Sequence, residues 1–465
     1  IVATDGLGSG AVVYEMDDLE LAGNLLVGGT LGVTGVLTGA SLDISGNIDI
    51  DGISNLDVID VDGAANFAAD VTFATGADII TASAGTSNVR VGVNAGNSIA
   101  SGGNHNVAVG DEAGTAISTG DGNIVIGFEA GHDITTGGYN TLIGWKSGDK
   151  IIDSNNNVAI GDASLSADTK GVKSVAVGSN TLNAQNFTST TGSFNTAVGF
   201  SAGLSVTTGL QNTLIGGLAG DALTSSNNNV AVGKSAMSGN TVSSSNVAIG
   251  TRALEIFNVT SDTSTYNVAV GEDAGALLTT GVQNTIVGGL AGDAVTTGSY
   301  NVIMGTNAGG GVTTGDQNII IGQGTNAAAL TGNTNTIIGD SAGQAMTSAA
   351  NNVAVGANTL VAHTTAANCT AVGANALQSN IAGADNTGLG KGALATNSSG
   401  SQNTAVGVRS MEDSTTSSDN TAIGWGSLTE NTTGASNTAL GRSALSANTT
   451  ASNNVAVGNG ALATE

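Results

Sequence analysis

A short hydrophobic phrase that ends in glycine recurs along most of this chain. In "NVAIG", residues 246–250, Val247, Ala248 and Ile249 are consecutive apolar positions before Gly250. β-branched residues favour strands, and the first and third of three strand residues point to the same side. The phrase therefore predicts a three-residue β-strand that ends at a glycine.

The phrase occurs 22 times, and 18 of the 21 intervals between its glycines are 17 residues long. The glycines stand at 92, 110, 127, 144, 161, 178, 199, 216, 233, 250, 271, 288, 305, 322, 339, 356, 373, 390, 407, 424, 441 and 458. A fixed period of this kind is typical of stacked coils. The sequence thus predicts an all-β protein, a β-solenoid of 17-residue coils over residues 83–465.

Both faces of the predicted strands are apolar. Val, Ile or Thr occupies the first strand position in every copy, and the third position is always aliphatic; the residue between them is mostly Ala. We expect the first and third residues to face the interior of the coil. The Ala face then needs a second cover, and its small side chains suit close approach of a partner chain. This predicts an oligomer.

Asparagine precedes the strand in 20 of 22 copies, with Ser174 and Cys369 as the exceptions. Asparagines stacked at the coil spacing of about 4.8 Å can hydrogen-bond to one another as an internal ladder. The invariant glycine predicts a corner with positive φ, or one with no room for a Cβ. The structural residues expected in these two roles are represented by Asn229, Gly233, Asn246, Gly250, Asn267, Gly271, Asn420 and Gly424.

After each glycine come two variable positions, which we expect to face solvent, and then a small residue. The fourth residue is Gly in ten copies, and the seventh is then Ile, Val, Leu or Met. Where the fourth is Leu or Met, the seventh is polar in ten of eleven copies. One large apolar side chain per coil therefore comes from either of two places. The simplest interpretation is a second short strand with an early or a late anchor.

Two coils, 178–199 and 250–271, are 21 residues long. Because the strand phrase is intact on both sides, the extra residues are expected in loops that leave the stack undisturbed. Phe187 and Phe257 lie in these segments and are candidates for lateral contact sites. A merely tolerated insertion is the alternative that we favour.

Aromatic residues either follow the corner glycine, as Trp145 and Trp425 do, or precede the asparagine, as Tyr139 does. These positions predict exposed corners. Exposed aromatic rings beside polar groups can bind sugars, but packing against the next coil is the favoured interpretation.

Composition limits the chemistry. The chain has 72 Gly, no Pro, 3% aromatic residues, 3 His and a net charge of -26. Such acidity argues against nucleic acid or an anionic membrane as partner. No apolar run approaches the roughly 20 residues of a membrane span, so no membrane insertion is expected. A single cysteine, Cys369, cannot form an intrachain disulfide. The absence of an initial Met suggests a fragment of a longer polypeptide.

Residues 1–82 contain no Lys, Arg or His and alternate aliphatic residues with Gly, Thr and Asp. This pattern predicts an acidic, glycine-rich β shaft or connector. Asp49, Asp51, Asp60 and Asp62 form two Asp-x-Asp-Gly runs that make Ca²⁺ the one candidate cofactor. Only part of a calcium loop is present, so solvated turn carboxylates are favoured and no cofactor is expected.

The phrases "NTAVGVRSM", "NTAIGWGSL" and "NTALGRSALSANTT" resemble the head repeats of trimeric autotransporter adhesins and the related repeats of bacteriophage tail fibres. The resemblance covers about residues 88–462. It implies a homotrimer in which each chain winds as a left-handed parallel β-roll. The N-terminal part resembles the β shafts of phage fibres, which favours a virion.

Together these features predict a non-enzymatic structural or adhesive fibre, a phage tail fibre shaft that attaches to the host surface or supports attachment. Its partners would be two further copies, a host receptor (glycan or protein) and other virion tail proteins; its location would be extracellular, on the virion. A bacterial cell-surface adhesin of the trimeric autotransporter type is the alternative. A polysaccharide-degrading tailspike is weaker, because its best carboxylate pairs, Asp111–Glu112 and Glu272–Asp273, are adjacent residues at exposed corners. Ice binding is weaker still, because Thr occupies the first strand position in fewer than half of the coils and is expected to face inward.

Overall fold

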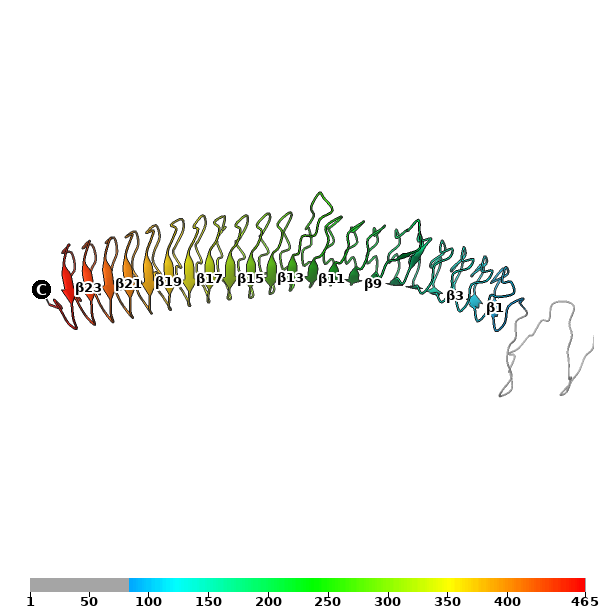
Figure 1. The fold of residues 1–465 in the computed structure, drawn as a ribbon, viewed down its shortest axis with the longest axis horizontal. Coiled ribbons are helices and arrows are strands. Elements are labelled where there is room, and N and C mark those ends of the chain that lie inside the picture. The colour runs from blue at the N-terminus through cyan, green and yellow to red at the C-terminus, as the bar shows by residue number, and fades with distance from the viewer. Residues whose placement is uncertain (1–82, 465) are drawn as a thin grey trace, which may run out of the picture. The chain divides into compact units, whose positions relative to one another are not determined.

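The computed structural model describes residues 83–464, which belong to the second of two compact units, Gly76–Glu465. The predicted shaft of residues 1–82 and its four candidate calcium-binding aspartates lie outside the described residues. Within 83–464 the chain is an all-β parallel solenoid that forms a curved stack of coils (Figure 1). This confirms the solenoid and the 17-residue coil.

Each coil contributes one strand to a single 22-stranded parallel sheet. Its strands are β1 (Val89–Val91), β2 (Val107–Val109), β3 (Ile124–Ile126), β4 (Thr141–Ile143), β5 (Val158–Ile160), β7 (Val175–Val177), β9 (Thr196–Val198), β10 (Thr213–Ile215), β11 (Val230–Val232), β12 (Val247–Ile249), β13 (Val268–Val270), β14 (Thr285–Val287), β15 (Val302–Met304), β16 (Ile319–Ile321), β17 (Thr336–Ile338), β18 (Val353–Val355), β19 (Thr370–Val372), β20 (Thr387–Leu389), β21 (Thr404–Val406), β22 (Thr421–Ile423), β23 (Thr438–Leu440) and β24 (Val455–Val457). Two shorter strands, β6 (Gly171–Val172) and β8 (Thr191–Gly192), pair separately.

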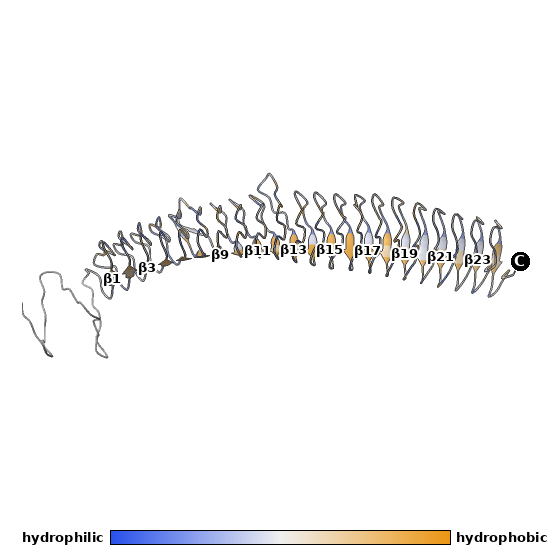
Figure 2. Ribbon diagram, turned by 180° about the vertical axis from the view of Figure 1, so that it is seen from behind, coloured by the Kyte–Doolittle hydropathy of each residue, from blue (hydrophilic) through white to orange (hydrophobic). Residues whose placement is uncertain are grey.

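The strands stack with corresponding residues side by side. Val247 of β12 pairs with Val268 of β13 although the intervening coil has four extra residues. Equivalent positions therefore form continuous columns along the stack. Figure 2 shows hydrophobic colour along much of the sheet.

The orientation of the strands is the reverse of our expectation. The middle residue, such as Ala248 or Leu214, is the one fully buried inside the coil, whereas the first and third residues face outward. The reason is the narrow cross-section of the coil. Ala is the middle residue of most strands and the third residue after most corners, and the thin core between them holds only one or two large side chains per coil. Bulky Val and Ile on the strand therefore point outward.

The predicted second strand is also wrong for most coils. The segment after the corner glycine is a series of turns in which residues two and four positions after the glycine have positive φ, as at Arg252 (56°) and Leu254 (51°). The predicted exchange of anchors is confirmed. Ile117, Ile134 and Leu278 at the seventh position are fully buried, and so are Leu254 and Leu377 at the fourth. Burying one such side chain contributes roughly 1.5–3 kcal/mol.

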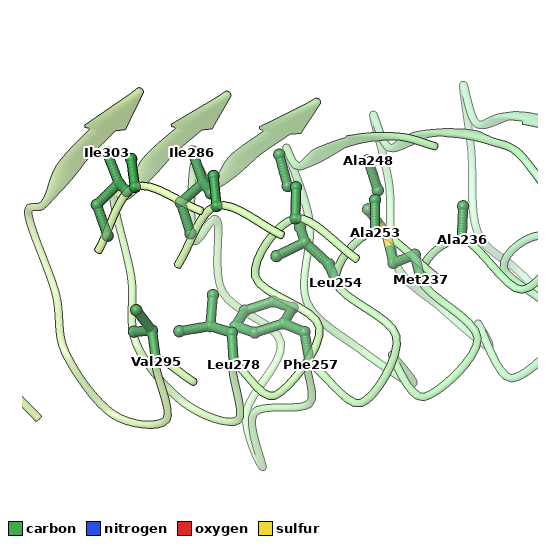
Figure 3. Packing of buried hydrophobic residues seen from close by; sticks show 14 of the residues in the cluster. Ala236, Met237, Ala248, Ala253, Leu254, Phe257, Leu278, Ile286, Val295 and Ile303 are labelled. Atoms are coloured by element: carbon green, nitrogen blue, oxygen red, sulfur yellow. The ribbon is translucent and has the colours of Figure 1, made fainter. Parts of the chain in front are cut away.

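Figure 3 shows how the two sides of the coil meet. Ile286 and Ile303 point inward from their strands, toward a row formed by Phe257, Leu278 and Val295. All five side chains are fully buried.

The strand-preceding asparagines form a buried ladder. Asn246 donates its backbone N–H to Oδ1 of Asn229 at 3.0 Å, and Asn267 does the same to Asn246 at 2.9 Å. The amide nitrogen of most of these asparagines also donates to a carbonyl of its own coil, as from Asn229 to Ser243 at 3.0 Å. Asn420 occupies the same place, bonded to Asn403 at 3.1 Å. These side chains therefore connect each coil to the next inside the stack.

The corner glycines combine positive φ with close stacking. Gly250 has φ of 136°, and a Cβ there would lie 2.2 Å from the carbonyl oxygen of Gly271. Gly233, Gly271 and Gly424 have the same conformation, with φ of 132°, 137° and 140°. The corners therefore require glycine for both of the expected reasons, the positive φ and the lack of room for a Cβ.

Candidate functional site

The outward side of the sheet, formed by the first and third residue of each strand, is called the sheet face below. Its columns contain only Val, Ile, Leu, Met and Thr, without a charged residue. Exposed fractions reach 40% at Ile215, 45% at Leu440 and 56% at Val91. The exposed large members are Val89, Val91, Ile124, Ile160, Ile215, Ile249, Met304, Ile319, Leu389, Ile423, Leu440, Val455 and Val457. Parallel sheets are ordinarily covered on both faces. The sheet face is thus an uncovered apolar strip along the coils.

The first six residues after each corner glycine form a second surface, called the turn face below. It holds most of the charged side chains, as expected from the sequence. Asp273 receives two hydrogen bonds from the guanidinium group of Arg252, at 2.7 and 2.6 Å. Glu112 lies 3.4 Å from Nε2 of His132. Each candidate pair, Asp111–Glu112 and Glu272–Asp273, therefore has one member beside a cationic or histidine partner from a neighbouring coil.

One ion-pair cluster on the turn face lowers the pKa of a carboxyl group, that of Asp133. Asp133 accepts from Lys150 at 3.2 Å and lies 2.6 Å from Nδ1 of His132. Partial burial favours a higher pKa for Asp133, but the hydrogen bonds from His132 and Lys150 outweigh it and the pKa is lowered. The carboxylate is therefore held in its charged form. Such a cluster joins coils at the surface.

A buried polar cluster lies at the first long coil, where Ser174 replaces the ladder asparagine. Gln185 donates to Asp168 at 2.6 Å and to Ser174 Oγ at 2.8 Å, and Asn195 donates to Gln185 at 2.8 Å. Gln185 thus connects Ser174 to Asn195 by hydrogen bonds and keeps the ladder continuous where asparagine is replaced. Burial raises the pKa of Asp168, against the hydrogen bonds from Gln185 and Gly171. The sequence shows Gln185 as a polar residue at the seventh position after the corner glycine. It does not show that Gln185 pairs with Ser174.

The corner aromatics lie at exposed positions, as predicted. Tyr139 is 68% exposed, Trp145 51% and Trp425 49%. Phe128 and Trp145 from successive coils stack with ring centroids 6.4 Å apart. Packing against the next coil, the favoured interpretation, is therefore present for this pair. Trp425 instead lies beneath a guanidinium group, with Cζ of Arg442 5.3 Å from its ring centre.

The two phenylalanines of the long coils are not where a lateral contact would need them. Phe257 is fully buried and Phe187 is 6% exposed. Phe257 joins the inner row of Figure 3, and the ring of Phe187 lies against Gly171, whose missing Cβ makes space for it. The loop tips are exposed at residues 188–190 and 260–264, and Asn186, Ile256 and Asn258 are exposed beside the phenylalanines. Any lateral contact would have to use these residues, not the phenylalanine rings.

Within residues 83–464, no group of three or more His, Cys, Asp or Glu side chains is arranged to hold a metal ion. The same part of the chain has no helix that is long and apolar enough to cross a membrane. Cys369 is a buried free thiol in the asparagine column, where burial raises its pKa.

Comparison with protein-family models gave no match for this chain, and comparison with curated proteins gave none.

Proposed function

We propose that this chain is the shaft of a non-enzymatic, homotrimeric fibre that attaches to a host surface or supports attachment, as phage tail fibres do. The proposal includes no cofactor and no nucleic-acid partner. The single observation that carries it is the uncovered sheet face.

The regularity of the sheet face favours identical chains as its cover. Columns of Val, Ile, Leu and Thr run along 22 strands that are stacked in register. A second copy has the same coil spacing, so side chains can interdigitate along the whole stack without losing register. A globular partner would cover only a few coils. Burial of a continuous apolar strip is the usual basis of a permanent interface.

The number of copies comes from the resemblance of the repeats to trimeric adhesin heads and tail-fibre repeats. A single coil stack has a thin core, and three stacks that share their sheet faces would enclose a second one. With one coil per about 4.8 Å, 22 coils extend roughly 100 Å. Such a length suits a shaft that holds a binding surface away from its carrier.

Light scattering on the purified chain tests the assembly. We expect a mass about three times the 44.8 kDa of one chain. A monomeric mass would contradict the proposal, and so would a dimer.

Substitutions separate the sheet face from other surfaces. Ile215→Lys combined with Ile249→Lys places two charges on the sheet face and should lower the mass to that of the monomer. Leu277→Lys is a matched control, because Leu277 is 50% exposed on the turn face. It should leave the mass unchanged. Equal effects of the two variants would mean that the sheet face is not the interface.

A bacterial cell-surface adhesin of the autotransporter type would use the same trimer. Any sequence that the gene encodes beyond Glu465 distinguishes the two. A tip or chaperone domain would support the tail fibre, and a membrane anchor would support the adhesin. For the virion location, immunogold labelling of purified particles should place the protein on the tail; unlabelled tails would contradict it.

The absence of enzymatic activity is part of the proposal. The turn-face carboxylates Asp273 and Glu112 lie beside Arg252 and His132, in ion-pairing positions on an exposed surface. Incubation of the fibre with host polysaccharide should release no reducing ends. Release that is lost in Glu272→Gln would establish a tailspike activity instead.

A further inference from the structure

A groove runs over the turn face of the C-terminal coils. It consists of two adjacent cavities of about 360 and 270 Å³ that share Arg409 as a wall. The first reaches from Asn375 to Glu412, and the second from Arg409 to Ser446. Individual ligand pockets begin at about 300 Å³, so the pair is of a size to hold several linked small units. The groove belongs to the turn face, and the corner glycines lie between it and the sheet face.

Two of the three basic residues of the C-terminal coils line this groove. In the sequence after Arg252, the only Lys and Arg residues are Lys391, Arg409 and Arg442. All three lie one or two residues after a corner glycine, in coils that begin at 390, 407 and 441. Lys391 and Arg409 line the first cavity. In a chain with a net charge of -26, these two side chains give the groove specific cationic partners for an anionic group, beside the carboxylates of Glu412 and Glu430.

Lys391 and Arg409 both remain able to donate hydrogen bonds to a ligand. Among residues 83–464, Lys391 takes part in no ion pair, and Arg409 pairs only through Nε, with Glu412. The two terminal nitrogens of the Arg409 guanidinium group are thus left for another acceptor. A planar guanidinium presents them in the geometry that a carboxylate accepts.

The coil between Arg409 and Arg442 contributes Trp425, which lines the second cavity. Its indole is 49% exposed and is packed against Cζ of Arg442, 5.3 Å from the ring centre, and not against another ring. The matching N-terminal residue differs, because Trp145 is stacked on Phe128 at 6.4 Å. An exposed indole in a groove offers an apolar wall against which the C–H face of a pyranose ring packs.

Acceptor groups complete the groove. Glu412 lines the first cavity, and Glu430 and Thr429 line the second. Carboxylates accept hydrogen bonds from sugar hydroxyls, but they repel a densely charged ligand such as a polyphosphate. The groove therefore combines cations, an aromatic wall and hydroxyl acceptors. Successive coils contribute Lys391, Arg409 and Trp425 in turn, at the coil spacing of about 4.8 Å, close to the length of one pyranose unit in an extended polysaccharide.

We propose that this groove binds an acidic oligosaccharide in which pyranose units carry single carboxylates. Lys391 and Arg409 pair with the carboxylates, Trp425 packs against a ring, and Glu412 and Glu430 accept from hydroxyls. The inference deepens the proposed fibre function, because it names the class of host-surface ligand. Binding itself can be measured without any host.

Trp425 provides the readout. The chain has two tryptophans, so Trp145→Phe leaves Trp425 as the only one. In that background we expect a saturable change in fluorescence on titration with an oligomer of galacturonic acid. The same oligomer with its carboxylates methyl-esterified should bind at least tenfold more weakly, because it retains the sugar and lacks the charge. Absence of a saturable change, or equal affinity for the ester, would overturn the proposal.

Variants test the named residues. Lys391→Gln and Arg409→Gln should each reduce affinity about tenfold, which is the loss of one good charged contact. Lys234→Gln is the matched control, since Lys234 is an exposed lysine directly after a corner glycine in a coil outside the groove. It should bind like the parent. An equal loss in Lys234→Gln would show a non-specific attraction to the surface and overturn the site.

The mass of the assembly separates this inference from the fibre function. A trimeric protein that fails to bind the acidic oligomer would refute the groove and leave the fibre standing. A monomeric protein that binds it with the predicted dependence on Lys391 and Arg409 would support the groove and refute the trimer.

Discussion

Asn380 donates from Nδ2 to Nδ1 of His363 at 3.0 Å, while Nε2 of the same imidazole lies 2.8 Å from the carbonyl oxygen of Ala366. The imidazole is therefore neutral, with its proton on Nε2, because a proton on Nδ1 would face the amide hydrogens of Asn380. Burial lowers the pKa of His363, against the hydrogen bonds with Ala366 and Asn380. This pair begins an inner polar column that continues through Asn397, which donates to Asn380 at 3.0 Å.

The first prediction concerns acid. A histidine whose pKa is lower in the folded than in the unfolded chain contributes stability above its unfolded pKa of 6.5, and this stability is lost as the pH falls below that value. Hydrogen exchange in β18–β20 should therefore accelerate between neutral pH and about pH 5, after correction for intrinsic rates. His363→Asn should remove most of this acid sensitivity. His105→Asn, at an exposed position, is the control and should retain it. Equal behaviour of both variants would contradict the assignment.

The second prediction concerns the asparagine ladder. In Asn229→Ala the buried backbone N–H of Asn246 loses its acceptor, which costs about 1–3 kcal/mol. The loss should be local, because each coil of a solenoid contacts only its neighbours. Hydrogen exchange should accelerate in β11 and β12 and stay unchanged in β22. Asn228→Gly, at an exposed neighbour with φ of 58°, should have little effect. Uniform acceleration along the stack would argue against a local ladder.

The third prediction concerns Cys369, which takes the place of an asparagine in the ladder. Asn352 Oδ1 accepts the backbone N–H of Cys369 at 2.8 Å, but at the next step of the ladder the acceptor is the Cys369 sulfur, which is a weak one. Cys369→Asn gives the backbone N–H of Asn386 an amide oxygen in its place and should stabilise the surrounding coils by about 1 kcal/mol. Ser174→Asn is the informative comparison, because the Ser174 hydroxyl already bonds Ser193 and Gln185, and a longer side chain would have to displace the Gln185 amide. It should destabilise. Thermal unfolding of the two variants in parallel distinguishes repair from a general preference for asparagine.

The fourth prediction concerns the corners. Gly250→Ala forces a Cβ to within 2.2 Å of the Gly271 carbonyl oxygen at a φ of 136°, so two coils must separate locally. We expect a loss of at least about 2 kcal/mol from strain and broken coil contacts. In Gly289→Ala the new Cβ meets nothing within 4 Å. That control should unfold like the parent protein, and a comparable loss there would mean that the corner geometry is not the cause.

The period and the exchange of anchors between the fourth and seventh positions could be predicted from the sequence, because both depend on volume and recur in every coil. Which face of the strand points into the core could not be predicted from the sequence. Val247 and Ile249 look like core residues by hydrophobicity, yet Ala248 is the one buried, because the width of the coil decides and is not visible in a pattern. Leu254 adopts a φ of 51°, a conformation that its residue type does not signal, so the turns were interpreted as a strand. The groove could not be predicted from the sequence, because its members lie 16 to 18 residues apart in neighbouring coils.

The last prediction concerns the second long coil, where the structure changes the placement of the insertion. Asn258 still bonds Thr241, 17 residues before it, whereas Ser264 lies opposite Ser244, 20 residues before it. Most of the extra length therefore lies in Thr260–Thr263, all exposed, and Phe257 occupies the buried seventh position. Deleting Thr260–Thr263 should preserve the stack, because β12 and β13 already pair in register. Phe257→Ala should instead cost about 3–5 kcal/mol through the cavity that it leaves. Thermal unfolding and hydrogen exchange of the two variants provide the measurement. A deletion that destabilises as much as Phe257→Ala would mean that the loop takes part in holding the coils together.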